Sequence, residues 1–354
     1  MRFRLALGSA VALSISGIVT AIPGALLPTW RPLFEPGPKL AWYFNLSLFG
    51  TLIGLTLVRW LPGRHPWFSA SLLLAAFGLS NMALAHSFDA IVLGALPLGL
   101  SVGMINLNAN ALPGELYPER RMVVLSQVNA AFGAGAVATP LLVALLPWRS
   151  VLFAFAGFAC LGAGLVWRSP SGQSNSQVTS WRSTWGLLLA LVVLVYAGLE
   201  QSLATFGAAY LNERGLSKDA AGLLLSLYWL SFTVGRLLLS YFVARAPLRN
   251  LNRLVICVVP VALFLSVKAA WLLPVAGLLI GPAFSTFLAL GQGRMGNSAV
   301  AMVLYGGAGG VNLIPAIVAL LPIAWTPSLL GALAALLIVL IAVFQRVDGR
   351  VVAG

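Results

Sequence analysis

The chain has 354 residues, of which 60% are hydrophobic and only 8% are charged. Soluble domains carry about 25% charged residues, so this composition excludes a water-soluble protein and predicts a chain embedded in lipid. The formal net charge is +13, and the basic residues stand at the ends of apolar runs. We therefore expect anionic membrane lipids, and not nucleic acid, as the partner of this positive charge.

Twelve apolar stretches follow one another along the chain, and a membrane-spanning helix needs about 20 such residues. The first stretch begins with two arginines, like a signal peptide, but it continues to Trp30, which predicts an uncleaved first helix. We predict an all-α membrane protein with twelve transmembrane helices. Their expected bounds are 5–29, 38–61, 67–86, 89–113, 122–147, 149–168, 184–211, 219–244, 250–270, 271–292, 296–322 and 326–346.

The distribution of Lys and Arg predicts how these helices are oriented. If the N-terminus lies in the cytoplasm, most of the 21 basic residues fall on the inner side of the membrane. Cytoplasmic loops of membrane proteins carry such an excess of positive charge. We therefore expect both termini in the cytoplasm and a multi-pass protein of the cell inner (plasma) membrane.

The second half of the chain repeats the first at about half the chain length. A polar stretch rich in Ser and Gln interrupts the apolar pattern near the midpoint and predicts a cytoplasmic linker at 169–183. It separates two pseudo-symmetric six-helix bundles, 1–168 and 184–354. Such a duplication in so apolar a chain is typical of transporters whose halves rock around a shared site. The matched segments are PLLVALLP at 140–147 with PAIVALLP at 315–322, GLSVG at 99–103 with GLLIG at 277–281, and Gly54 and Arg64 with Gly235 and Arg245.

Glu200 is the carboxylate expected to couple transport to protons. The other acidic residues fall at loops or helix ends, whereas Glu200 lies near the middle of the span 184–211. An ionisable group at that depth costs several kcal/mol unless it faces a cavity or finds a partner. Such a group can take up a proton from a wet cavity and hold it when the cavity closes. The structural alternative is a protonated Glu200 that hydrogen-bonds to another helix.

Polar and aromatic side chains within the spans are the expected substrate-binding residues. Amides suit a sugar or another polyhydroxyl ligand because both need several hydrogen bonds. Flat rings suit sugar faces and drug-like molecules alike. The alternative for the asparagines is hydrogen bonding between helices, and for the rings it is packing. The candidates are Gln201, Tyr196, Asn106, Asn110, Asn312, Asn45, Trp42, Tyr228, Trp229, Phe284 and Tyr305.

Other residues within the spans are expected to be structural. We expect Thr205 to hydrogen-bond within its own helix, and Gln127 and Asn129 to hydrogen-bond between helices. Four tryptophans are expected in the belts at the membrane surfaces, where amphipathic rings gather. These are Trp30, Trp67, Trp148 and Trp325.

Charged residues toward the inner ends of the spans are candidates for gating. Arg236 lies in the inner third of its span, where its side chain can snorkel to the headgroups or form an ion pair with Glu115 or Glu119. Arg64 and Arg245 complete this group. No catalytic constellation, metal-binding spacing or Walker A motif occurs, so we expect neither an enzyme nor a cofactor or metal.

The twelve spans, their six-plus-six repeat and the central linker resemble the major facilitator superfamily. GTLIGLTLVRWLPGR at 50–64 is similar to that family's loop motif between helices 2 and 3, although it lacks the usual acidic residue. GAGAVATP at 133–140 resembles the glycine–proline pattern of helix 5, which is associated more often with antiporters.

Within the superfamily, the stretches 99–135, 196–238 and 281–290 resemble the branch of fucose and related sugar–proton symporters. Glu200 matches an acidic position common in helix 7 of that branch. Symporters of that branch usually carry further carboxylates in helices 1 and 4, and this sequence has none in helix 1 and asparagines in helix 4.

The resemblance implies a secondary transporter that works by alternating access. We predict proton-coupled transport of a small polar solute such as a sugar. The alternative is a proton-driven exporter of drug-like or amphipathic metabolites, for which a wide apolar cavity would be typical. The expected partners are the solute, protons and membrane lipids, and we expect a monomer.

Overall fold

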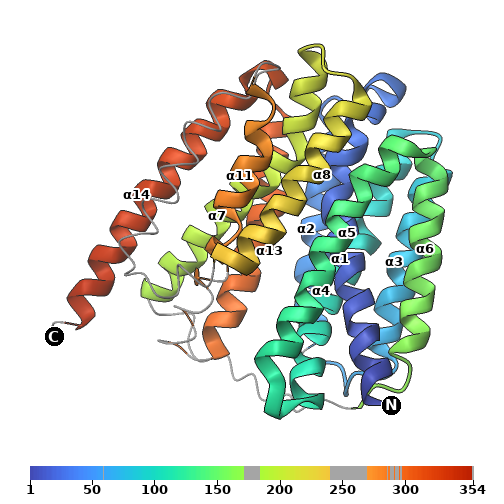
Figure 1. Cartoon of the computed structure of the whole chain (residues 1–354), viewed down its shortest axis with the longest axis vertical. Helices are drawn as coiled ribbons and strands as arrows, with labels where there is room; N and C mark the ends of the chain where they lie inside the picture. Colours follow the sequence, from blue (N-terminus) through green and yellow to red (C-terminus); the bar gives the residue numbers. More distant parts are fainter. Residues whose placement is uncertain are drawn as a thin grey trace. The chain divides into compact units, whose positions relative to one another are not determined.

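The computed structural model describes residues 1–58, 60–170, 184–239, 269–284, 286–287, 291, 295 and 297–352. Regular secondary structure in these residues is helical, and no strand occurs among them. The chain forms two compact units, Met1–Ser174 and Asn175–Gly354, each drawn as helices in Figure 1. The division falls inside the stretch expected to be a linker, most of which lies outside the described residues.

The first unit (blue to green in Figure 1) forms helices at the six places expected from the sequence. A short 3₁₀ turn, η1 (Pro118–Arg120), precedes the fifth of them. The helices are α1 (Arg2–Phe34), α2 (Lys39–Leu57), α3 (Trp67–Leu84), α4 (Phe88–Leu116), α5 (Arg121–Leu145) and α6 (Trp148–Leu165).

The second unit (yellow-green to red in Figure 1) is described in part. The predicted span 250–270 lies almost entirely outside the described residues, and the predicted span 271–292 is represented by α11. The described elements are α7 (Thr184–Glu213), α8 (Lys218–Val234), the π-helical turn η2 (Gly235–Leu239), α11 (Leu272–Ile280), α13 (Asn297–Ala319), the 3₁₀ turn η4 (Ile323–Trp325) and α14 (Thr326–Val352).

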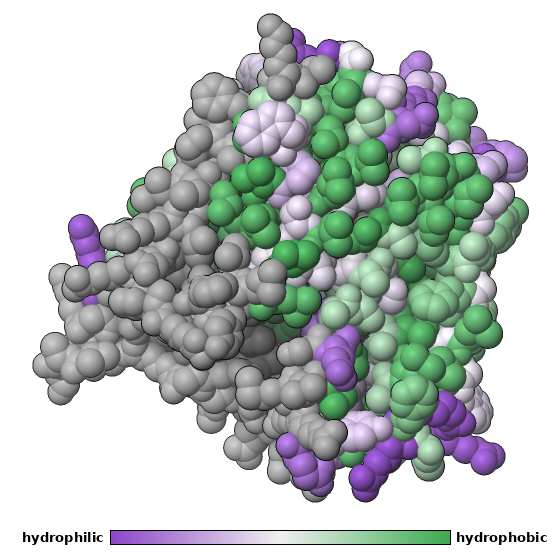
Figure 2. Space-filling view, viewed as in Figure 1, coloured by the Kyte–Doolittle hydropathy of each residue, from purple (hydrophilic) through white to green (hydrophobic). Residues whose placement is uncertain are grey.

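Ten helices of the described part are long and apolar enough to cross a membrane. Figure 2 shows apolar side chains over the middle of the first unit and hydrophilic ones toward its two ends, as expected for helices that cross a bilayer. The architecture is therefore that of a multi-pass membrane protein. The total of twelve helices and the cytoplasmic position of the termini stay predictions.

Glycines bring α2 and α4 into backbone contact along their middle. A Cβ atom at Gly54 would overlap the carbonyl of Leu100, and one at Gly103 would overlap the carbonyl of Thr51. Only glycine therefore fits at these positions without moving a helix. Because Gly50 meets the stretch 96–100 and Gly54 meets the next turn, the two helices run in the same direction.

The same contact recurs between α8 and α11 in the second unit. A Cβ atom at Gly235 would overlap the Leu278 carbonyl, and one at Gly281 would overlap the Phe232 carbonyl. These glycines are the repeat counterparts of Gly54 and Gly103. The sequence repeat thus corresponds to a repeated helix–helix contact.

A second repeated contact joins α1 to α5 and α7 to α13. A Cβ atom at Gly135 would overlap the Ser14 carbonyl of α1, and one at Gly310 would overlap the Leu194 carbonyl of α7. Gly135 and Gly310 precede the two matched VALLP segments by the same distance. Close approach through small residues is how membrane helices gain packing energy in the absence of a hydrophobic driving force.

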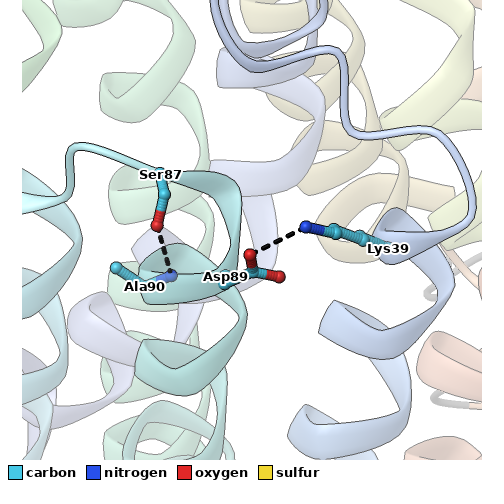
Figure 3. Close-up of polar contacts among 4 residues, drawn as sticks. All are labelled: Lys39, Ser87, Asp89 and Ala90. Carbon is cyan, nitrogen blue, oxygen red and sulfur yellow. Dashed lines mark hydrogen bonds and ion pairs between the residues drawn. The ribbon is translucent and has the colours of Figure 1, made fainter.

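An ion pair joins the beginnings of α2 and α4 (Figure 3). The Ser87 hydroxyl accepts a hydrogen bond of 3.4 Å from the backbone N–H of Ala90, which caps α4. Asp89 lies in the first turn, where the helix dipole favours a negative charge. Lys39, the first residue of α2, donates to the Asp89 carboxylate at 2.7 Å. Both side chains are exposed, so the pair contributes about 0–1 kcal/mol.

The prediction that Trp30 lies in a membrane-surface belt is wrong. Its ring is fully buried in the first unit and packs against Tyr43 and Phe88, with ring centroids 6.0 and 5.8 Å away. Trp67 and Trp325 are 37% and 57% exposed. A tryptophan at a helix end can therefore serve the interior of a bundle as well as its rim.

Gly103→Ala should destabilise the first unit because the added methyl group must displace backbone atoms of α2. We expect a loss of about 1–3 kcal/mol, seen as a lower melting temperature of the purified protein in detergent. Gly157→Ala is the matched control, since a Cβ atom at that exposed glycine of α6 meets nothing within 4 Å. Equal melting temperatures for the two variants would contradict the close packing of α2 on α4.

Candidate functional site

Glu200 lies in the buried part of α7, where residues 195–211 are all buried. Small residues in this stretch, such as Gly198 and Gly207, allow the neighbouring helices to approach. The Glu200 residue is 7% exposed. Among the side chains that the structure describes, it is the one buried carboxylate. Burying an ionisable side chain in a membrane helix costs free energy, and such residues are usually functional.

Two tyrosines surround Glu200. Tyr228 of α8 is fully buried, and its hydroxyl donates a hydrogen bond of 3.0 Å to the backbone carbonyl of Glu200. Tyr196, one helical turn before Glu200, is within hydrogen-bonding reach of the Glu200 carboxylate, and its hydroxyl also lies 3.3 Å from the carbonyl of Ile280 at the end of α11. Tyr228 therefore links α8 to the backbone of α7 at Glu200, and Tyr196 links α7 to the end of α11.

Arg236 belongs to the same cluster, which sequence reasoning did not foresee. It lies in the π-helical turn η2, and its guanidinium is within electrostatic range of the Glu200 carboxylate. The guanidinium carbon sits 4.6 Å from the ring centre of Phe232 and 5.5 Å from that of Phe284. Cation–π contacts of this kind stabilise a guanidinium next to aromatic rings. π-Helical turns occur often at functional sites.

Gln201 and Thr205 form the other polar pair of α7. The Gln201 amide donates to the Thr205 hydroxyl at 3.1 Å, and both residues are buried. Thr205 thus forms a hydrogen bond within its own helix, as expected, and its partner is the candidate binding residue Gln201. Both lie on the helix that carries Glu200.

Three asparagines of α4 and α5 form a hydrogen-bonded group: Asn106, Asn110 and Asn129. The Asn129 amide donates to the Asn110 side-chain oxygen at 2.9 Å. The Asn110 amide donates to the backbone carbonyl of Asn106 at 2.8 Å. Asn110 therefore forms a hydrogen bond between helices with Asn129, which was the alternative to its expected role in substrate binding. Asn106 is half-buried, and the buried Asn108, which was not singled out, bonds back to the Met104 carbonyl at 3.0 Å.

The remaining expected binding residues are spread over both units. Asn312 on α13 is buried and donates to the Ala308 carbonyl of its own helix at 3.0 Å. Trp229 is fully buried, Trp42 is 62% exposed and Asn45 is exposed. Phe284 and Tyr305 are half-buried. The second unit therefore brings together Glu200, Gln201, Tyr196, Tyr228, Trp229 and Phe284, whereas Asn45, Trp42, Asn106 and Asn110 belong to the first.

Arg64 and Glu115 form a bidentate ion pair at the end of α4. The two terminal nitrogens of Arg64 donate to the two oxygens of Glu115 at 2.8 and 2.6 Å. Arg64 is only 6% exposed. The loop motif lacks its usual acidic residue, and Glu115 of α4 provides a carboxylate partner for Arg64 instead. Glu119 is exposed, and Arg245 lies outside the described residues.

Phe232 was not singled out, but it could have been predicted from the sequence. It lies four residues after Tyr228 and four before Arg236, on the face shared by α8 and the turn η2 that continues it. The interhelical hydrogen bond expected of Asn129 is confirmed. By contrast, nothing in the sequence marks the Ile280 carbonyl as a neighbour of Tyr196. No cluster of three or more His, Cys, Asp or Glu suited to a metal occurs in the described residues.

The sequence model of the Major Facilitator Superfamily matches residues 9–316. Curated relatives include the protein TsgA homolog of Citrobacter koseri, 21% identical over 315 residues that cover 82% of this chain and 80% of the relative. The protein TsgA of Salmonella arizonae is 21% identical over 317 residues, with the same coverage.

Similar solved structures include the nucleoside transporter NupG, with a TM-score of 0.73 at 14% identity and 98% of each chain covered. The D-xylose–proton symporter has a TM-score of 0.76 at 13% identity, with 96% of this chain and 97% of that chain covered. At such identities these likenesses show the fold alone. Together with the match over most of the sequence, they show that this chain belongs to the Major Facilitator Superfamily and is a multi-pass membrane transporter, not an enzyme.

Proposed function

We propose that the chain is a proton-coupled secondary transporter of a small, polar, sugar-like solute in the cell inner membrane. It acts as a monomer by alternating access, exposing its binding residues to one side of the membrane at a time. The observation that carries the proposal is the buried Glu200, which lies beside two buried tyrosines and within electrostatic range of Arg236. A titratable group with such partners can exchange its interactions when it gains or loses a proton.

The solute class is supported by the polar groups of both units. Gln201 and Asn312 present amides from α7 and α13, and Asn106 does so from α4. A polyhydroxyl solute needs such donors and acceptors. Among proteins of similar fold, one is titled a D-xylose–proton symporter and one a nucleoside transporter, and both titles fit the proposal.

The Arg64–Glu115 pair supports a gating role at one end of the first unit. A bidentate guanidinium–carboxylate contact is geometrically demanding, and here the arginine is buried. The contact therefore holds the segment after α2 firmly to the end of α4 in the present state. We infer that it stabilises one of the two alternating states. By the sequence repeat, Arg245 occupies the equivalent position of Arg64 in the second half.

Glu200→Gln should abolish accumulation of solute driven by a pH gradient while leaving exchange of solute across the membrane intact. The amide keeps the size and hydrogen bonding of the side chain but cannot carry a proton. The measurement uses purified protein in proteoliposomes and a labelled sugar selected by thermal-shift screening, since a bound solute raises the melting temperature. Asp219→Asn, at the exposed start of α8, is the control and should accumulate solute normally. Undiminished accumulation by the Glu200 variant would sink the proposal.

Reversing the Arg64–Glu115 pair tests the gate. Arg64→Glu and Glu115→Arg alone each place like charges together and should lower both the exchange rate and the melting temperature. The double variant should recover much of both. The exposed Lys39–Asp89 pair is the control, for which the corresponding reversals should change stability by no more than about 1 kcal/mol. A double variant as impaired as its single parents would show that the pairing itself does not matter.

A further inference from the structure

The beginning of α1 packs against the end of α6, at the end of the first unit that is marked N in Figure 1. A Cβ atom at Gly8 would meet the stretch 165–166 at the end of α6, and one at Gly162 would meet Val11 of α1. The later residue of α1 thus faces the earlier residue of α6, so the two helices run antiparallel. We call this contact the α1–α6 seam.

Exposed arginines gather at the end of the α1–α6 seam. The Arg4 guanidinium donates a hydrogen bond of 2.8 Å to the backbone carbonyl of Trp167. Arg168 is the next residue in the chain, and Arg2 is the first residue of α1. All three arginines are exposed. In the described part of the chain, none of them forms an ion pair with a carboxylate.

The acidic residues of the first unit lie elsewhere or already have partners. Glu35 follows the opposite end of α1, and Asp89 forms an ion pair at the start of α4. Glu115 forms an ion pair at the end of α4, and Glu119 is exposed in η1. The polar stretch 169–183 contains no acidic residue. Within the first unit the arginines of the seam therefore remain open to an anion.

Arg168 has a backbone conformation that favours glycine. Its φ is 59°, in the left-handed region where a Cβ atom causes strain, and glycine is the usual residue in this conformation after a helix. Its backbone N–H donates a hydrogen bond of 3.3 Å to Nδ1 of His65. The His65 ring in turn contacts the Trp167 ring edge to face, with centroids 4.6 Å apart. A strained arginine at this position favours a functional role for its side chain.

Exposed apolar residues lie beside these arginines on one side of the seam. Leu7 precedes Gly8 and Leu161 precedes Gly162, so in antiparallel helices both leucines lie on the same side of the seam. Both are exposed, at 44% and 69%. Gly164 lies three residues after Leu161 on that face, and a Cβ atom there would meet nothing within 4 Å. This apolar strip has room for a chain laid over it.

We propose that the α1–α6 seam binds an anionic phospholipid. Arg4 and Arg168 hold the phosphate, because the planar donors of a guanidinium match its oxygens. The half-exposed Trp167 lies at the level of the headgroup, as tryptophans do at membrane surfaces. The acyl chains cover Leu7 and Leu161. The charge selects an anion, and the adjoining apolar strip selects a lipid over free phosphate. The proposal does not depend on the proposed transport mechanism.

The lipid site adjoins the loop between α2 and α3. His65, which contacts Trp167 and Arg168, is the neighbour of Arg64 in the chain. Arg64 is in turn bound to Glu115 at the end of α4. A lipid held by α1 and by the residues after α6 therefore stabilises this end of the first unit, and it should raise the melting temperature of the protein.

Lipid titrations of the purified full chain test the ligand class. Delipidated protein in a neutral detergent receives dioleoylphosphatidylglycerol, dioleoylphosphatidylcholine or inorganic phosphate, and its melting temperature is recorded. We expect only phosphatidylglycerol to raise it, and the rise should shrink as salt is added, because salt screens exposed charges. Equal rises with the two lipids would overturn the proposal. A rise with inorganic phosphate equal to that with phosphatidylglycerol would replace the lipid site by a free-anion site.

Arg168→Gly separates lipid binding from folding. Glycine suits the left-handed φ and keeps the N–H that His65 accepts, so the lipid-free variant should melt no lower than the wild type. The loss of one charge should weaken phosphatidylglycerol binding about fivefold, and Arg4→Gln should have a similar effect. Arg214→Gln, which removes an exposed arginine at the end of α7, is the control and should bind as the wild type does. Wild-type affinity in both Arg4→Gln and Arg168→Gly would refute the site.

Gly164→Leu tests the apolar strip. The added side chain enters open space, so the variant should fold normally, but it occupies the surface where the acyl chain lies. We expect weaker binding of phosphatidylglycerol and an unchanged melting temperature without lipid. Gly157→Leu is the matched control, because its Cβ atom also meets nothing within 4 Å and it lies about 10 Å further along the same face of α6. Equal affinities of the two variants would exclude a lipid chain at the seam.

Discussion

Backbone contact through glycine is the constraint on which both units depend. Lipid is as apolar as the helices, so close approach has to supply the packing energy. Gly54 and Gly103 provide it between α2 and α4, and Gly235 and Gly281 provide it between α8 and α11. A parallel set joins α1 to α5 and α7 to α13. Several of the repeated positions of the sequence, Gly54 with Gly235 and Gly103 with Gly281, are therefore points of backbone contact in both units.

The two units share the same helix–helix contacts but differ in the polar residues that they carry. In the second unit α7 carries Glu200, and α8 continues into a π-helical turn that turns Arg236 onto Phe232 and Phe284. In the first unit, Asn129 of α5 donates a hydrogen bond to Asn110 of α4. The second unit therefore buries a carboxylate, whereas the first unit buries the arginine of an ion pair at the end of α4 and joins amides between α4 and α5.

The positions of the described helices and the burial of Glu200 within one of them could be predicted from the sequence, because length and hydropathy determine them. The face of each helix that is buried could not be predicted from the sequence. In a soluble protein the exposed face is polar, but here both lipid and core select apolar residues. Trp229 is thus fully buried and Trp42 largely exposed with no difference in their sequence surroundings that foretells it. The prediction that Trp30 lies at the membrane surface was wrong for the same reason. The partners of Arg236 and Glu115 depend on which helices become neighbours, which one-dimensional spacing does not contain.

The ion pairs at the two ends of α2 and α4 have a consequence for sidedness. Lys39 and Asp89 join the helices where both begin, and Arg64 and Glu115 join them where α4 ends. Because these helices run in the same direction across the bilayer, the two pairs face different aqueous compartments. The solution on each side of the membrane therefore contacts a different ion pair of the α2–α4 helix pair. Salt added to one side screens the pair on that side alone, and the exposed Lys39–Asp89 contact is the more sensitive of the two.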